Sequence, residues 1–164
     1  MHHSTAQSAR HCCFLVGGDC FAVPSAAVAE VLQEGRLTRV PLAADAVVGL
    51  VHLRGRIVPV VDLRRRLGIA PADSSAQRTH LVVALDDDWY SLLVDEMLDV
   101  MEVPAEAIEQ TSQRSAEPYG DAVVGVFAGP ERLVHFLDPQ RIIQALGRHR
   151  ESFLSKSESF HGGS

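Results

Sequence analysis

The residues in this sequence best suited to bind a metal are His11, Cys12, Cys13 and Cys20. Structural zinc sites usually pair their cysteines as Cys-x-x-Cys, a spacing that this sequence lacks. The apolar run that starts at Cys12 predicts a strand, in which neighbouring side chains point to opposite faces, so Cys12 and Cys13 could not easily share one ion. An odd number of cysteines without a framework fits a reducing compartment. We therefore expect the thiols to pack as small buried hydrophobes, with no metal and no cofactor.

Two acidic groups are the next candidates. The run 86–88, DDD, stands between two apolar runs, where three acids most simply form a solvated turn. Without further spaced ligands it is weak evidence for Ca²⁺ or Mg²⁺. Asp95, Glu96 and Asp99 lie in an alternating stretch, and we expect them at solvent-facing strand positions rather than as a general acid–base pair.

Motifs for catalysis are missing from the sequence. No serine stands in a Gly-x-Ser-x-Gly elbow, and no glycine-rich loop ends in Lys-Ser/Thr. The only lysine is Lys156, close to the last residue, so the usual amine for Schiff-base or phosphate chemistry is lacking. We expect a protein that is not an enzyme.

Arg54 is the charged residue whose position is most suggestive. It stands beside Gly55 at the predicted tip of a hairpin, where a guanidinium would project as a planar fork into solvent. Arginine is favoured where carboxylates must be held with defined geometry. A plain solvated turn residue is the alternative, and the residue pattern alone leaves both open.

The elements that would position these residues occur twice. Residues 49–62 and 125–138 have the same layout: two apolar runs around a turn, closed by an aspartate that can cap a short helix. A second correspondence, at a shift of 69 residues instead of 76, covers the preceding strands. The two shifts place Ile57 over Leu133 and Val31 over Val100. We infer an internal duplication of one small β unit.

Many short strands, strong turn signals and a duplication predict a mainly β fold of two small barrels with about five strands each. We expect the first barrel at about residues 12–69, a polar linker at 70–78 and the second barrel at about 79–147, with short helices and a C-terminal helix that ends at Gly147. Residues 1–11 and 148–164 are expected to be flexible tails.

Composition narrows the class of partner. Of the 164 residues, 46% are apolar, enough for a core, and no apolar run reaches the ~18 residues of a membrane span. The formal charge of −6 disfavours nucleic acid, because phosphates require a basic face. We expect a cytoplasmic protein that recognises other proteins, without direct membrane insertion.

The run 49–64, GLVHLRGRIVPVVDLR, resembles the signature of the chemotaxis coupling-protein family, the CheW-like domain. Residues 94–100, VDEMLDV, and the closing segments 125–126 and 133–138 resemble later motifs of that family, in the same order. The resemblance covers about residues 12–147 as a single CheW-like domain. It implies two SH3-like five-stranded β-barrels around a shared apolar core.

The same resemblance implies a non-enzymatic adaptor. Family members link the cytoplasmic tip of methyl-accepting chemotaxis receptors to the regulatory domain of a CheA-type histidine kinase, in the cytoplasm at membrane-associated arrays. Alternatives within the family are an adaptor of a pilus-motility or surface-sensing pathway and a module that competes with another coupling protein; outside it, a regulatory fragment of a kinase is less favoured. The positions that match the family's partner-contact sites are Val28, Glu30, Gly49, Leu53, Arg54 and Gly55.

Overall fold

The fold is described by a computed structural model that places residues 8–33, 37–39, 46–73, 77–111 and 119–146. It is mainly β, as predicted, and its helices are short. The strands are β1 (Ser8–Val16), β2 (Asp19–Pro24), β3 (Val28–Gln33), β4 (Thr38–Arg39), β5 (Val47–Leu53), β6 (Arg56–Asp62), β7 (Thr79–Leu85), β8 (Asp88–Val94), β9 (Glu96–Pro104), β10 (Glu109–Gln110), β11 (Val123–Ala128) and β12 (Leu133–Leu137). The α-helices are α1 (Leu63–Leu67) and α2 (Pro139–Gln144), and the 3-10 turns are η1 (Ser25–Ala27), η2 (Ala105–Ala107) and η3 (Gly120–Ala122).

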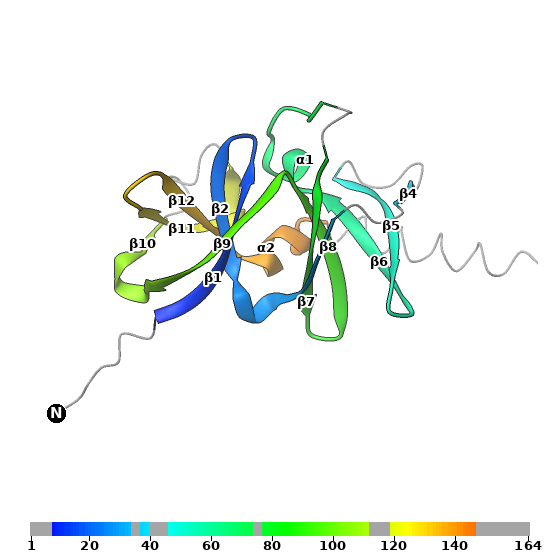
Figure 1. Ribbon diagram of the computed structural model, residues 1–164, viewed down its shortest axis with the longest axis horizontal. Helices are drawn as coiled ribbons and strands as arrows, with labels where there is room; N and C mark the ends of the chain where they lie inside the picture. Colours follow the sequence, from blue (N-terminus) through cyan, green and yellow to red (C-terminus); the bar gives the residue numbers. More distant parts are fainter. Residues whose placement is uncertain (1–7, 34–36, 40–45, 74–76, 112–118, 147–164) are drawn as a thin grey trace, which may run out of the picture.

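The strands form two six-stranded sheets that lie side by side with α2 between them (Figure 1). Sheet A has the order β10-β11-β12-β2-β1-β9, and sheet B has the order β4-β5-β6-β8-β7-β3. Each sheet is antiparallel except at one junction, β12 with β2 in sheet A and β6 with β8 in sheet B. Each sheet therefore has six strands rather than the predicted five, in the same arrangement.

The two halves of the chain exchange hairpins. Sheet A joins β1 and β2, from the first half, to the last four strands of the second half, and sheet B joins β7 and β8 to the last four strands of the first half. The predicted boundary at 70–78 therefore does not coincide with the division of strands between the sheets. The reason is that β3 pairs with β7, and β9 pairs with β1, across the seam.

Of the predicted tails, residues 1–7 and 148–164 lie outside the described residues. Gly147, the predicted end of the C-terminal helix, lies outside them too. Residues 8–11, however, belong to β1, which starts earlier than the sequence suggested. Because most of these residues are polar, their sequence does not predict a strand. In the structure, Ser8 to His11 pair with residues 101–104 of the long strand β9. Backbone pairing to a partner strand thus extends β1 beyond its apolar part.

One apolar cluster crosses the sheet boundary and is the shared core. It contains Phe14 and Phe21 from sheet A, Leu81 and Leu92 from sheet B, and Ile142 from α2, all fully buried. The buried residues of two smaller clusters come from sheet A and from sheet B, respectively. Because burial of apolar area is the dominant favourable term in folding, this arrangement makes neither sheet independent of the other.

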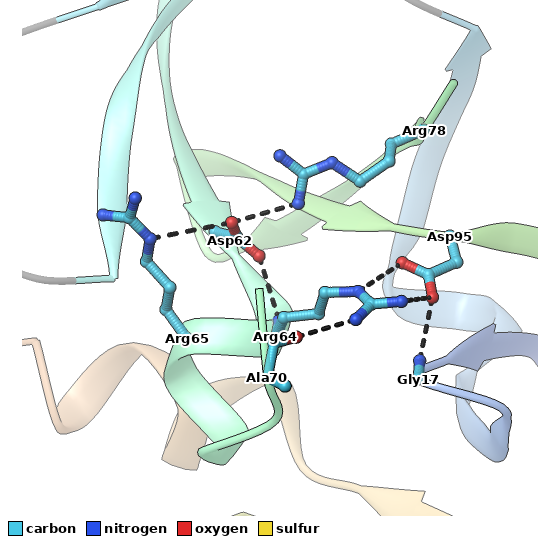
Figure 2. Close-up of polar contacts among 7 residues, drawn as sticks. All are labelled: Gly17, Asp62, Arg64, Arg65, Ala70, Arg78 and Asp95. Carbon is cyan, nitrogen blue, oxygen red and sulfur yellow. Dashed lines mark hydrogen bonds and ion pairs between the residues drawn. The ribbon is translucent and has the colours of Figure 1, made fainter. Parts of the chain in front are cut away.

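A polar contact fixes the crossing between the sheets. Asp95 lies at the point where the chain leaves β8 and enters β9, and its carboxylate accepts a hydrogen bond from the Gly17 amide in the β1–β2 turn (2.8 Å). The same carboxylate holds the guanidinium of Arg64, in α1, at 3.0 Å from Nε and 2.6 Å from Nη2 (Figure 2). Asp95 is therefore half-buried in a network, and the prediction that it faces solvent is wrong, because the alternation of strand faces is broken at the crossing.

A second aspartate positions α1 for this contact. Asp62 accepts from the Arg64 amide at 3.0 Å, which confirms the predicted N-cap, and its other oxygen binds Arg78 at 3.0 Å and lies 3.8 Å from Arg65 (Figure 2). Gly68 ends the helix in the left-handed conformation. Arg78 stands just before β7, so part of the predicted linker is held to the first half.

None of the helices in the described ranges is both long and apolar enough to cross a membrane.

We predict that Asp95→Asn lowers the free energy of unfolding by about 1–3 kcal/mol at neutral pH, because Arg64 loses its charged partner. Burial alone would raise the pKa of Asp95, but the hydrogen bonds from Arg64 and Gly17 and the nearby arginine charges outweigh it and lower the pKa below 3.8. The folded state therefore favours the carboxylate. The difference between wild type and variant should be constant well above pH 3.8 and shrink as the pH falls through and below that value. Urea unfolding at several pH values measures it.

The matched control is Asp99→Asn, an exposed carboxylate four residues further along β9. We expect this variant to stay within about 0.5 kcal/mol of wild type, as surface substitutions usually do. Equal losses for the two variants, or a loss at Asp95 that does not change with pH, would contradict the role of the carboxylate in joining the sheets.

Candidate partner-binding site

The predicted hairpin exists, and its turn explains the Arg-Gly pair. β5 and β6 pair from Val47 to Val61 at one end and Leu53 to Arg56 at the other, with Arg54 and Gly55 as the two-residue turn. Both turn residues have positive φ, 51° and 76°. This backbone suits the right-handed twist of the flanking strands, and glycine adopts it without the steric cost of a Cβ. The turn therefore holds the Arg54 side chain outward at the end of sheet B.

The guanidinium of Arg54 forms an ion pair with a carboxylate of the same chain, that of Glu30. Its Nε donates to Glu30 Oε2 at 3.0 Å and its Nη2 to Oε1 at 3.4 Å, although 69% of the Arg54 side chain is exposed. The hydrogen bond and charge of Glu30 raise the pKa of Arg54. The expectation of a fork projecting freely into solvent is thus only half right: the guanidinium is exposed but paired.

The rest of the hairpin tip is also held in place. Arg56 donates to the Asp87 carbonyl at 3.0 Å, and its guanidinium lies 4.5 Å from the centroid of the Trp89 ring, which is a cation–π contact. Asp86 and Asp87 form the β7–β8 turn, as predicted for this acidic run. Three elements, β3, the β5–β6 tip and the β7–β8 tip, therefore fix the position of Arg54.

The six predicted contact residues divide into three groups, of which Gly49 alone is the third. Arg54 and Gly55 are exposed and Glu30 lies against them, so these three form one surface. Val28 and Leu53 are half-buried and pack against two different apolar clusters.

Gly49 is buried and has a structural reason to be glycine. A Cβ there would lie 2.2 Å from the carbonyl oxygen of Thr38 and 2.9 Å from a methyl of Leu37. The backbones of β4 and β5 approach too closely for any larger residue, just after a bulge between Val47 and Gly49.

The sequence reasoning missed two exposed apolar side chains near this surface. Val31 follows Glu30 on β3 and is 45% exposed, and Ile57 follows Arg56 on β6 and is 53% exposed. The duplication could have drawn attention to them, because the corresponding residues of sheet A, Val100 and Leu133, are exposed too. Large apolar side chains are therefore exposed at equivalent positions of both sheets. Core packing does not require this exposure.

The other candidate residues do not assemble into a reactive site. Cys12, Cys13 and Cys20 are buried and free, and Cys12 faces a different apolar cluster from the other two, as the strand pattern predicted. Across the described ranges, no three His, Cys, Asp or Glu side chains come together in a way that could hold a metal ion.

Comparison with known proteins shows which family the chain resembles. Residues 10–147 match the family model described as "CheW-like domain". The chain is 29% identical over 139 residues to a probable chemotaxis protein CheW of Rhizobium etli (85% of this chain, 87% of the relative). It is 30% identical over 116 residues to the chemotaxis protein CheW of Thermotoga maritima (71% and 75%).

A further relative and a solved structure widen the comparison. The protein PilI of Pseudomonas aeruginosa is 35% identical over 97 residues (59% of this chain, 54% of the relative). The crystal structure of the scaffolding protein TtCheW from Thermoanaerobacter tengcongensis superposes with a TM-score of 0.73, covering 80% of this chain and 90% of that one at 22% identity, and so has the same fold.

We predict that Gly49→Ala destabilises the chain by about 1–3 kcal/mol, the usual range for overpacking, because the new methyl would meet a backbone oxygen that cannot turn away. The comparison variant is Gly125→Ala, at the corresponding position of sheet A. There the nearest atom is the Ile108 Cγ2 methyl at 2.6 Å, which a rotamer change can move, with the Glu109 carbonyl oxygen at 3.1 Å. Chemical denaturation should rank Gly49→Ala as the more destabilised, and the reverse order would contradict this explanation.

Proposed function

The chain belongs to the CheW-like domain family, and we propose that it is a non-enzymatic adaptor that couples methyl-accepting chemoreceptors to a CheA-type histidine kinase. The observation that carries the proposal is the family match, which spans residues 10–147 and so includes both sheets and both helices. The proposal also accounts for a sequence without a recognised catalytic motif and for an exposed charged hairpin.

The proposed contact surface is centred on Glu30, Arg54 and Gly55. Exposed apolar side chains are available on the two strands that carry Glu30 and Arg56, at Val31 and Ile57. Charged groups at the edge of an interface set orientation and partner choice, whereas apolar side chains supply most of the affinity. An exposed ion pair contributes little to folding stability, so its charges can be shared with a partner at low cost. Val28, half-buried at the start of β3, would offer an apolar contact to the helical tip of a receptor.

The proposed location follows from the partners. A chain that binds the cytoplasmic tip of a receptor and the regulatory domain of a kinase would be cytoplasmic and recruited to membrane-associated arrays. The alternative of an adaptor in a pilus-motility or surface-sensing pathway stays open, as does competition with another coupling protein. The relative named PilI is 35% identical over 97 residues, and the CheW of Thermotoga maritima is 30% identical over 116 residues, so these names and identities select no single pathway.

The test uses purified receptor cytoplasmic fragment and kinase regulatory domain from the organism that encodes this chain. We expect wild type to bind both, and Arg54→Glu to bind at least one of them about tenfold or more weakly, because the reversed charge would repel both Glu30 and an acidic partner group. Interferometry measures the affinities, circular dichroism verifies the fold, and receptor-dependent kinase activity gives a functional readout.

Two further variants separate a partner contact from a purely internal role. Glu30→Arg combined with Arg54→Glu rebuilds the internal ion pair with reversed polarity, and we expect it not to restore binding. Arg132→Glu, an equal charge change on the β11–β12 hairpin of sheet A, is the control and should not reproduce the Arg54→Glu loss. Restored binding in the double variant would mean that the Glu30–Arg54 pair only stabilises the fold and does not contact a partner. If wild type binds neither partner, the proposed function is wrong.

A further inference from the structure

Sheet A carries an open cleft of about 500 Å³ that the proposed adaptor function does not use. It lies on the opposite sheet from Glu30 and Arg54, beside the β11–β12 turn. Its wall includes the side chains of Cys13, Cys20, Met101 and Val134, with Asp99 and Arg132 among the charged residues that line it. Four sulfur-containing side chains from three strands therefore line one cleft, the fourth being that of Met97 on β9.

Cys13 and Cys20 line the same cleft and also lie on neighbouring strands. Cys13 stands opposite Ala22 and Cys20 opposite Leu15, so the cysteines lie diagonally across the β1–β2 pair. Both belong to the same apolar cluster, which Met101 joins from β9. Cys12 points to the other face, where its sulfur lies 3.5 Å from the Ser25 hydroxyl.

We propose that this cleft binds a soft monovalent cation, Cu(I), through the sulfur atoms of Cys13 and Cys20 with the thioether of Met101 as a third donor. Thiolate and thioether sulfur are the ligands that select Cu(I) among the biological metals. A closed-shell Cu(I) ion accepts low coordination numbers, so two thiolates and one thioether suffice. The open side of the cleft gives the ion a route of entry.

Zinc does not fit the same residues. Structural zinc requires four tetrahedral ligands from cysteine, histidine or carboxylate. No cluster of three such residues is present in the part of the chain that the structure describes. Asp99 does line the cleft, but it lies outside any such cluster, so the donor set here is sulfur alone.

Binding must release protons, and the environment of the thiols sets how many. Burial, followed by the neighbouring thiols, raises the pKa of Cys13 to about 12, and burial also raises the pKa of Cys20. Both groups are therefore protonated at neutral pH, and the balanced step is Cu(I) plus two thiols giving a copper bis-thiolate plus two protons. Because the metal competes with these protons, its affinity should rise as the pH rises.

The experiment is a competition for Cu(I) between the full chain and bicinchoninate, without oxygen and with ascorbate present. We expect one Cu(I) per chain, and affinity lowered by more than about 100-fold in both Cys13→Ser and Cys20→Ser, since losses of second-shell groups alone cost 10–100-fold. Cys12→Ser is the matched control, with the same chemical change one residue away on the opposite face, and should bind Cu(I) like wild type.

Two readouts prevent confusion with a general loss of structure. Circular dichroism and thermal unfolding establish that each serine variant is folded, and Met101→Leu, which keeps the apolar volume, should weaken binding by a smaller factor. Proton release measured in weakly buffered solution should approach two per Cu(I) near neutral pH. The proposal is overturned if wild type fails to compete, if Cys12→Ser loses as much affinity as Cys13→Ser, or if fewer than one proton is released.

Discussion

The reciprocal exchange of hairpins is the constraint on which the rest of this structure depends. Each sheet needs two strands from the other half of the chain, so neither sheet can be completed until both halves are present. The crossing from β8 to β9 is where that exchange is fixed, and there the carboxylate of Asp95 ties the β1–β2 turn to α1. The guanidinium of Arg64 binds both carboxylate oxygens and the Gly17 amide donates to Oδ2 as well, which gives the contact a defined geometry as well as energy. The shared core of both sheets and α2 then follows from the strand exchange.

The duplication preserves the framework and varies the surface. Both sheets have a bulge before a buried glycine, Gly49 and Gly125, and both have an aspartate cap that starts a helix. The ends of the sheets differ, however. The residues that correspond to Glu30 and Arg54 in sheet A are Asp99 and Pro130, so sheet A has no equivalent of the exposed ion pair and instead carries an open cleft. One symmetric framework therefore carries two surfaces of different chemistry.

Local signals in the sequence predicted local structure well. Asp62 and Asp138 cap the helices as expected, and the two-residue turn at Arg54 and Gly55 forms because few other residue pairs adopt that backbone. Features that depend on distant pairing were not predictable: the early start of β1 on β9, the sheet to which each hairpin belongs, and the role of Asp95.

The site shows the same limit. Sequence placed Glu30 and Arg54 among the contact residues, but their pairing depends on sheet B bringing two segments 24 residues apart together, which no local pattern encodes. On the proposed function, that pairing would also change how the site works. A free arginine would only need to meet a partner's carboxylate, whereas Arg54 would have to share or exchange the carboxylate of Glu30 that it already holds. Because an exposed ion pair contributes little to folding stability, this exchange would cost little free energy but would require a complementary charge on the partner. The ion pair would therefore favour discrimination between partners over tight binding to any one of them.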